Sequence, residues 1–229
     1  MTPTFKAVAD HALLVTFADQ ISDAVHAKVV ALDKAIASRA PLGVIETIPA
    51  LVNLLVSFDP LVTDHSAVET ATRACLEDLD VQTLQGQVRR VQVCYDGPFA
   101  PDIDAVAAAT GLSRDAVINA HLAGDYRVLM YGFSPGYAYL SGVAADIQVP
   151  RKAAPLRDVP AGSVIIAGPQ CLITTLTMPT GWSIIGRSPT QVLTGDPDHP
   201  FLFDVADHVM FERIDLAAFD RLSVGATHG

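Results

Sequence analysis

The N-terminal part of the chain alternates between short apolar runs and segments with helical spacing. Three apolar runs ended by turn residues predict strands, at residues 11–17, 44–48 and 52–58. Two amphipathic segments predict helices, and Ser22 and Asp64 are suited to cap them at residues 22–38 and 64–79. With a further strand at residues 88–94, the order β-α-β-β-α-β is that of a small split βαβ sandwich.

The pattern of apolar and polar residues changes after residues 78–87, where we expect the boundary between two domains. Two short helices are expected at residues 102–109 and 113–122, the second capped by Ser113. From residue 126 onward the chain is strand-like, in the runs YRVLMYGF, GSVIIAG, CLITTLT, WSIIG, TQVLTG and DHVMFERI. Short strands separated by Pro and Gly, without helices between them, predict a barrel or sandwich. We therefore expect an α+β protein with a small domain at residues 1–86 and a β-barrel domain at residues 87–229.

Composition restricts the possible partners and the cellular compartment of the protein. The formal charge of −10 argues against nucleic acid as a partner, because phosphate binding requires a basic surface. The most apolar window, residues 48–58, is too short to span a bilayer, so we expect no membrane association. The cysteines are Cys75, Cys94 and Cys171, an odd number without a C-x-x-C motif. With no recognisable signal peptide, this suggests a reducing compartment and a cytoplasmic protein.

The stretch YGFSPGYAYL, residues 131–140, contains G-x-S-x-G, the pattern of a serine hydrolase nucleophile elbow. In an elbow, the backbone N–H of the residue after the serine forms part of the oxyanion hole. Here that residue is Pro135, which has no N–H and favours an extended conformation for Ser134. We therefore interpret the stretch as a backbone-shaped binding loop, in which Ser134 is a hydrogen-bonding side chain.

Few other patterns indicate chemistry. The chain lacks both G-x-x-x-x-G-K-[ST] and G-x-G-x-x-G, the two standard phosphate cradles. Its seven histidines have no metal-ligand spacing, so no metal site is expected. His121 ends a predicted helix and could either complement the helix C-terminus or face a ligand. Arg151 and Arg187 occupy turns at strand ends, where an arginine fork suits a carboxylate or phosphate.

Three longer blocks resemble one family. They are GFSPGYAYLSG, VPRKAAPLRDVPAGSVIIAGPQ and MPTGWSIIGRSP, in that order, and ETIPALVNLLVSFDP and VCYDGPFAPDIDAVAAATGL add to the likeness further upstream. The chain resembles the allophanate hydrolase subunit 1 family over nearly its whole length. This family includes the B subunit of bacterial ATP-dependent 5-oxoprolinase and the sporulation kinase inhibitor KipI.

The resemblance implies a small N-terminal α+β domain and a cyclophilin-like C-terminal β-barrel. It also implies two partners. One is a homologue of allophanate hydrolase subunit 2, the C subunit of 5-oxoprolinase, and the other is an A subunit of the LamB/YcsF type. The assembled complex would use ATP with Mg to open 5-oxoproline to glutamate, and we expect this chain to be inert alone. Two alternatives stay open, a histidine kinase inhibitor and a carboxyltransferase component of a urea carboxylase or allophanate hydrolase system.

We expect one ligand cleft, which contains the residues His121, Tyr131, Ser134, Tyr137, Arg151, Gln170 and Arg187. The arginines would hold a carboxylate or phosphoryl group, and Ser134 and Tyr137 would orient the amide. Several positions depart from the family pattern, namely Pro98 in place of an acidic residue, Leu156 in place of an arginine, and the stretches CLITT and PTGW. These changes lie around the expected cleft, so they bear on the identity of the substrate.

Overall fold

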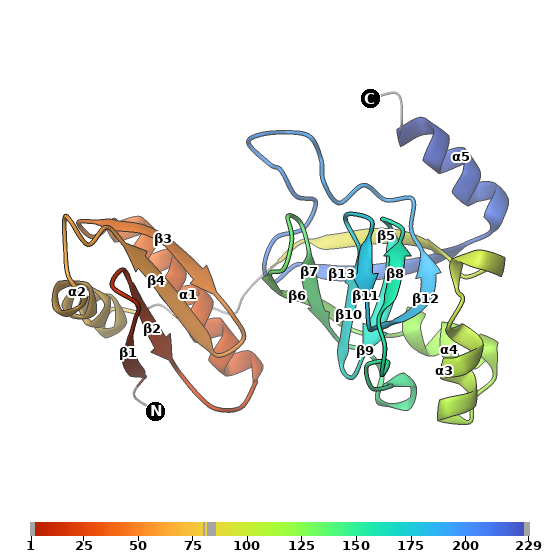
Figure 1. Ribbon diagram of the computed structural model, residues 1–229, viewed down its shortest axis with the longest axis horizontal. Coiled ribbons are helices and arrows are strands. Elements are labelled where there is room, and N and C mark those ends of the chain that lie inside the picture. Colours follow the sequence, from red (N-terminus) through yellow and green to blue (C-terminus); the bar gives the residue numbers. More distant parts are fainter. Residues whose placement is uncertain (1–2, 80, 82–85, 227–229) are drawn as a thin grey trace. The chain divides into compact units, whose positions relative to one another are not determined.

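The computed structural model describes residues 3–79, 81 and 86–226, and the chain forms two compact units, residues 1–84 and 85–229 (Figure 1). The expected domain boundary, between residues 86 and 87, lies beside this division. The mixed α+β class expected from the sequence is confirmed. Each unit has a hydrophobic core of its own.

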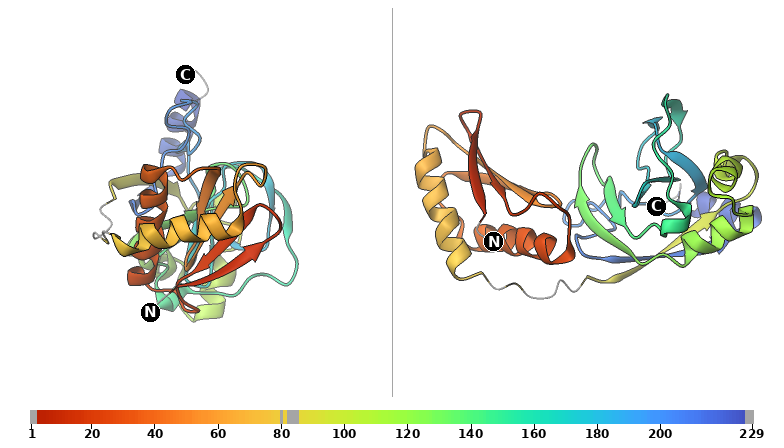
Figure 2. Two further views of the ribbon diagram at one scale, coloured as in Figure 1. Left: turned by 90° about the vertical axis from the view of Figure 1, so that its left-hand side faces the viewer. Right: turned by 90° about the horizontal axis from the view of Figure 1, so that it is seen from below.

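The first unit is a four-stranded antiparallel sheet with two helices. Its elements are β1 (Thr4–Val8), β2 (Ala12–Thr16), α1 (Asp23–Arg39), β3 (Val44–Pro49), β4 (Asn53–Phe58) and α2 (His65–Glu77). The strand order is β1-β2-β4-β3. Apolar side chains of both helices share one core with inward residues of β2 and β4, so both helices cover the same face of the sheet (Figure 2). Ser22 and Asp64 accept hydrogen bonds from the first turns of α1 and α2, as expected of N-caps.

The expected order β-α-β-β-α-β is wrong in two details. The strand β1 precedes the first expected strand, and its mostly exposed side chains form no apolar run. The strand expected to close the sandwich is β5 (Val88–Cys94), which pairs with strands of the second unit. The first unit therefore has the order β-β-α-β-β-α.

The second unit is a closed seven-stranded barrel with flanking helices. Its remaining elements are η1 (Gly97–Phe99), α3 (Ile103–Thr110), α4 (Arg114–Leu122), β6 (Tyr126–Tyr131), β7 (Ala138–Ser141), η2 (Ala145–Ile147), β8 (Leu156–Val159), β9 (Ser163–Ala167), β10 (Gln170–Ile173), β11 (Met178–Thr180), β12 (Ser183–Arg187), β13 (His208–Ile214) and α5 (Leu216–Ala226). The barrel order is β10-β7-β6-β13-β5-β12-β9, and β9 pairs with β10 to close it. All of these pairs are antiparallel except β13 with β5.

The strand β9 shows why the barrel strands read as continuous apolar runs. All five of its residues are buried. Val164 and Ile166 belong to the main core of the unit, whereas Ile165 and Ala167 belong to a second cluster that includes Val159 and Met178 of the β8–β11 pair. Because both faces are covered, both sets of side chains must be apolar.

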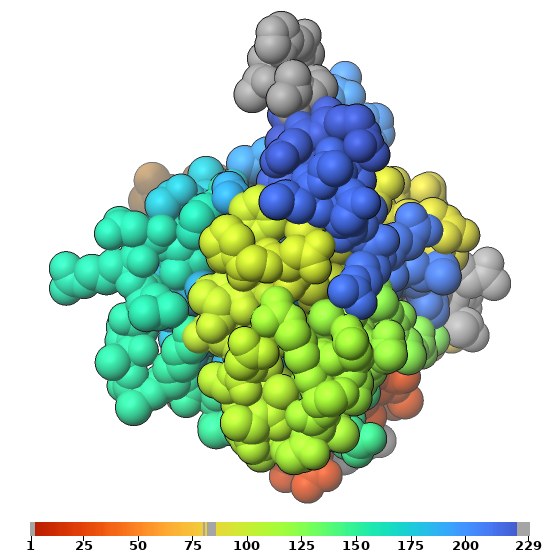
Figure 3. All heavy atoms as spheres, turned by 90° about the vertical axis from the view of Figure 1, so that its right-hand side faces the viewer, coloured from red at the N-terminus to blue at the C-terminus, as the bar shows by residue number. Residues whose placement is uncertain are grey.

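Some elements of the second unit differ from expectation. The run TQVLTG is not a strand, and Leu193 makes only an isolated bridge to Phe201. The strands β7, β8 and β11 and the helix α5 have no clear sequence signal, because β8 is largely exposed and β7 and β11 are only four and three residues long. α5 lies against the segment that follows β5, and the rings of Phe99 and Phe219 are 4.4 Å apart (Figure 3).

A buried carboxylate joins two neighbouring strands of the barrel. Asp207, which directly precedes β13, accepts hydrogen bonds from the Gln87 backbone N–H at 2.7 Å, the Arg89 Nε at 2.7 Å and the Asp204 backbone N–H at 3.0 Å. Gln87 directly precedes β5, so one carboxylate ties together the starting points of the two parallel strands. No tight turn can join parallel strands, so contacts such as these hold the two starting points together in place of a short connection.

Replacing Asp207 with alanine should therefore destabilise the barrel strongly. The change removes the acceptor of two part-buried backbone N–H groups and of the Arg89 Nε, and leaves that guanidinium only a 3.4 Å contact with the exposed Asp204, so we expect the free energy of unfolding to fall by about 3 kcal/mol. Trp182, the only tryptophan, lies in this unit and reports its unfolding in urea by fluorescence.

The matched control is Glu212→Ala. Glu212 pairs with Arg90 across the same two strands, but the Arg90 side chain is 63% exposed and that of Glu212 is 39% exposed, so the loss should stay below about 1 kcal/mol. Equal losses for the two variants would contradict the role given to Asp207.

Candidate functional site

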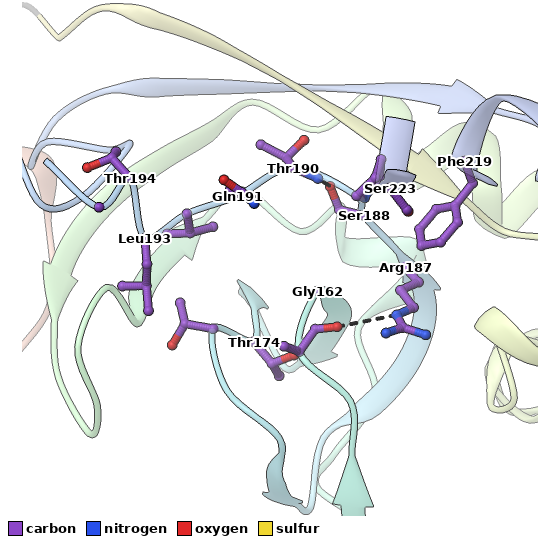
Figure 4. Close-up of a pocket in the computed structure, with 15 residues that line it drawn as sticks. Gly162, Thr174, Arg187, Ser188, Thr190, Gln191, Leu193, Thr194, Phe219 and Ser223 are labelled. Atoms are coloured by element: carbon purple, nitrogen blue, oxygen red, sulfur yellow. Dashed lines mark hydrogen bonds between the residues drawn. The ribbon is translucent and has the colours of Figure 1, made fainter. Parts of the chain in front are cut away.

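A large hollow of the barrel unit has a volume of about 660 Å³ (Figure 4). Its wall comes from the end of β12, the segment at residues 188–195, the residues that follow β10, and α5. Hydroxyl side chains are frequent among its lining residues, which include Thr174, Thr175, Ser188, Thr190, Thr194 and Ser223. The hollow is therefore suited to a small polar ligand.

Arg187 supplies positive charge to this hollow. Its Nε donates a hydrogen bond to the Ala161 carbonyl at 3.3 Å, and its Cζ lies 5.5 Å from the ring centre of Phe99 and 5.8 Å from that of Phe219. Figure 4 shows Phe219, from α5, beside the Arg187 side chain. Within the part of the chain that the structure describes, no carboxylate forms an ion pair with Arg187. A half-buried guanidinium without a counter-ion favours an anionic ligand.

The loop of residues 132–137 consists of two consecutive tight turns. The Ser134 N–H donates to the Gly132 carbonyl at 2.9 Å, which makes a γ-turn at Phe133 with φ of 73°. The Tyr137 N–H donates to the Ser134 carbonyl at 3.1 Å, with Pro135 and then Gly136 at the centre of this turn. Proline followed by a residue with positive φ is the signature of a type II turn.

Two features favour a glycine at position 136. One is the positive φ of 69°, and the other is the lack of space for a Cβ atom. A Cβ at this position would come within 2.7 Å of Leu193 Cδ2 and 3.3 Å of Thr175 Cγ2. Because Leu193 and Thr175 both line the large hollow, the loop backs directly onto its wall.

Ser134 takes part in this contact. Its Oγ lies 3.5 Å from the Thr175 Oγ1, which itself donates to the Pro135 carbonyl at 2.9 Å. Among the hydrogen bonds of the described residues, none joins Ser134 to a histidine or carboxylate that could activate it. The position of Ser134 is therefore that of a loop-fixing hydroxyl next to the hollow.

Tyr137 and Arg151 lie in a different, smaller pocket of about 150 Å³, together with Phe133, Tyr139 and Trp182. Trp182 directly precedes β12, and Arg187 is its last residue. At about 3.3 Å per residue, Trp182 and Arg187 are separated by roughly 16 Å of strand. The pocket that contains Arg151 and Trp182 and the hollow that contains Arg187 therefore lie apart. The expectation of a single cleft is therefore wrong, because these residues lie at opposite ends of β12.

Tyr131 and Gln170 also lie outside the large hollow. Tyr131 borders a third hollow of about 500 Å³, and its hydroxyl donates to the Phe203 carbonyl. Burial raises the pKa of Tyr131, so its hydroxyl stays protonated. Gln170 begins β10, pairs with Ala167 of β9, and lines none of these three hollows.

His121 is a core residue, which corrects both of the roles considered for it. Its side chain is fully buried, between Tyr126 and Phe211. Tyr95 Oη lies 2.7 Å from its Nδ1 and Cys171 Sγ lies 3.6 Å from its Nε2. Burial lowers the pKa of His121 to about 3, so it is neutral near pH 7 and neither complements the helix C-terminus as a cation nor meets a ligand.

The two groups that contact the His121 ring are neutral as well. Burial raises the pKa of the Tyr95 phenol and that of the Cys171 thiol, so both keep their protons. The Tyr95–His121–Cys171 chain is thus a neutral, internally satisfied part of the core.

Sequence reasoning missed most of the hollow's wall. Thr174 and Thr175 fall in an expected strand and in a stretch that departs from the family pattern, and Thr190 falls in an expected strand, but no motif marks any of them as a site residue. Phe219 lies in a helix that no motif marked. Among the residues that the structure describes, no group of three or more His, Cys, Asp or Glu side chains could hold a metal ion. In the same residues, no helix is both long and apolar enough to cross a membrane.

Comparison with known proteins identifies the class of this fold. The family described as "Carboxyltransferase domain, subdomain C and D" matches residues 3–203. The chain belongs to this family.

Curated relatives carry a more specific name. The B subunit of 5-oxoprolinase from Bacillus subtilis (strain 168) is 34% identical over 221 residues, which cover 90% of this chain and 91% of the relative. The protein of the same name from Escherichia coli O157:H7 is 34% identical over 74% of this chain and 78% of its own length. The resemblance read from the sequence motifs is thereby confirmed.

Solved structures agree on the fold. The crystal structure of TTHA0988 superposes with a TM-score of 0.79 at 29% identity and covers 90% of this chain, and this chain spans 40% of the length of TTHA0988. The urea amidolyase of K. lactis also gives a TM-score of 0.79 and covers 96% of this chain, but at 16% identity and with only 15% of its own length covered. That second likeness concerns the fold alone.

The buried state of His121 predicts a pH-dependent stability. The unfolded chain binds a proton on this histidine below pH 6.5, whereas the folded chain does so only near pH 3. The stability that this residue contributes is therefore complete above pH 6.5 and is lost as the pH falls toward 3. Between pH 6 and pH 4, His121→Gln should reduce the slope of unfolding free energy against pH by about 1.4 kcal/mol per pH unit.

The measurement is urea unfolding at pH 6, 5 and 4, followed by Trp182 fluorescence. His199→Gln is the matched control, because His199 is largely exposed. Identical slopes for wild type and His121→Gln would contradict the core assignment.

A second prediction concerns Ser134. Because no activating base contacts it and Pro135 provides no N–H, a fluorophosphonate probe should leave the protein unlabelled by intact mass. A known serine hydrolase in the same tube confirms that the probe is active. A stable adduct on Ser134 would overturn this interpretation.

Proposed function

We propose that this chain is the B subunit of a heteromeric 5-oxoprolinase, which couples the opening of 5-oxoproline to glutamate with the hydrolysis of ATP. The observation that carries the proposal is the 34% identity to the 5-oxoprolinase B subunit of Bacillus subtilis over 90% of this chain and 91% of the relative. A match that spans most of both chains supports a shared role better than a shared domain would.

The large hollow offers chemistry that fits this substrate. 5-Oxoproline is a small lactam with one carboxylate, and Arg187, at the wall of the hollow, forms no ion pair with a carboxylate among the described residues. In the proposal, the guanidinium holds the carboxylate, and threonine hydroxyls of the wall contact the lactam. Water is added across the ring amide bond, and the ring nitrogen becomes the amine of glutamate.

The proposal includes two further subunits. We expect a subunit 2 homologue (the C subunit of 5-oxoprolinase) and a LamB/YcsF-type A subunit to complete the active complex, and the chain alone to be inactive. ATP with Mg²⁺ is the expected co-substrate of the assembled complex. The sequence contains neither of the standard phosphate cradles, so in this chain the groups suited to a nucleotide are arginines and exposed aromatic rings.

The two alternative functions have less support. The likeness to urea amidolyase, at 16% identity, does not reach beyond the fold. A role as kinase inhibitor would require no anion site, and it gives no reason for a guanidinium left without a counter-ion.

Substituting Arg187 tests the proposal. In a complex co-expressed with a subunit 2 homologue and a LamB/YcsF-type homologue, wild type should release ADP in a 5-oxoproline-dependent reaction. Arg187→Ala removes the charged hydrogen bonds to the carboxylate, so the KM for 5-oxoproline should rise about 10- to 100-fold. Arg187→Lys keeps the charge without the fork and should give an intermediate value.

Arg221→Ala is the matched control, because Arg221 is an exposed arginine of α5 outside the lining of the hollow. It should leave the KM unchanged. Absence of 5-oxoproline-dependent ADP release with all three subunits present would reject the proposed function.

A further inference from the structure

Four aromatic rings form a continuous row on the barrel unit, away from the Arg187 hollow. The ring centres of Phe133 and Tyr137 are 5.5 Å apart, those of Tyr137 and Tyr139 are 5.9 Å apart, and those of Tyr139 and Trp182 are 6.1 Å apart. All four residues line the pocket of about 150 Å³. Such a row provides ring faces and edges for stacking a further planar group.

Two of the four rings are fixed by burial. Tyr137 and Trp182 are each only 5% exposed, and they pack in the apolar cluster between β9, β12 and the β8–β11 pair. Phe133, in contrast, is 75% exposed and has the positive φ of a γ-turn. A strained backbone that keeps a large apolar ring in solvent is typical of a binding position.

Arg151 adds positive charge to the row. Its Cζ lies 5.5 Å from the ring centre of Trp182, near the outer limit for a cation–π contact. The side chain is exposed, and no carboxylate in the described part of the chain forms an ion pair with it. The pocket thus combines flat apolar surface with an available guanidinium at one side.

We propose that this aromatic pocket binds a purine nucleotide, with the base stacked on the rings of Phe133 and Tyr139 and the phosphates at Arg151. A pocket of about 150 Å³ is the size of one base and leaves the ribose and phosphates outside. Base–aromatic stacking combined with an arginine is a recurring way to hold nucleotides without a glycine-rich cradle. The choice of ATP as the nucleotide rests on the proposed function.

The pocket's place in the fold suits this role. Trp182 comes just before β12 and Arg187 ends it, so one strand connects the aromatic pocket with the hollow proposed for the carboxylate. The net charge of −10 disfavours a polynucleotide, which would require many phosphate contacts. A single nucleotide needs only one cation and a stacking surface.

Trp182 makes the proposal directly measurable. It is the only tryptophan of the chain, so its fluorescence, selectively excited at the red edge of the aromatic absorption band, reports on this pocket alone. Titration of the full-length chain with ATP should give saturable quenching. Adenosine should quench more weakly, and tripolyphosphate, which has no base, should not quench and should compete poorly.

Variants separate the two parts of the site. Phe133→Ala and Tyr139→Ala each remove a stacking face, so the Kd for ATP should rise at least about fivefold. Tyr139→Phe keeps the ring and should restore wild-type affinity. Arg151→Ala should weaken ATP binding but leave adenosine binding unchanged, whereas Arg157→Ala, an exposed arginine of β8 outside the pocket, should leave both unchanged.

Several results would overturn the proposal. They are absence of saturable quenching in the full-length chain, equal effects of tripolyphosphate and ATP, and unchanged affinity in Phe133→Ala and Tyr139→Ala. Protection of Trp182 by the subunit 2 homologue with loss of ATP quenching would show instead that the pocket is a protein interface. ATP quenching without 5-oxoproline turnover would support nucleotide binding at this pocket and reject only the proposed function. Turnover without quenching would support the proposed function and reject nucleotide binding at this pocket.

Discussion

The carboxylate of Asp207 is the constraint on which the second unit depends. The strands β5 and β13 are parallel and begin 120 residues apart in the chain, so no short turn can set their register. Asp207 favours one register by accepting hydrogen bonds from Gln87 and Arg89, at the start of β5, while it directly precedes β13 itself. A slip of β13 by one residue against β5 would turn the buried Phe211 outward. The carboxylate and the buried side chains therefore favour the same register.

A fixed register also fixes where ligand groups can lie. β12 pairs with β5 on one side and β9 on the other, and its residues are held along a defined direction. Trp182 before the strand and Arg187 at its end consequently belong to different hollows. The separation follows from the rise of an extended strand, and no change of side-chain rotamer brings these two groups together.

The parts of the fold that the sequence predicted well are those with a strong local signal. β9 and β12 form apolar runs because most of their residues are buried, whereas in β13 only Val209 and Phe211 are buried. The residue types of Ser22, Asp64 and Ser113 are enough to predict the helix caps. The exposed β1 and β8 carry no such signal. The parallel pairing of β5 could not be foreseen, since an apolar run does not specify its neighbour. His121 could have been placed in the core, because it shares a helix face with the buried Val117 and Ile118.

The sequence predicts that residues 132–137 form a loop shaped by its backbone, but only the structure shows that this loop borders two separate pockets. On one side, Phe133 and Tyr137 contribute rings to the aromatic pocket. On the other, the Pro135 carbonyl and Ser134 hydroxyl contact Thr175, which lines the Arg187 hollow. Two consecutive turns with internal hydrogen bonds define the backbone of this loop, so the same six residues shape part of the wall of both pockets. Within the described residues, the serine of G-x-S-x-G faces the Thr175 hydroxyl and no base, which fits a role in fixing the loop.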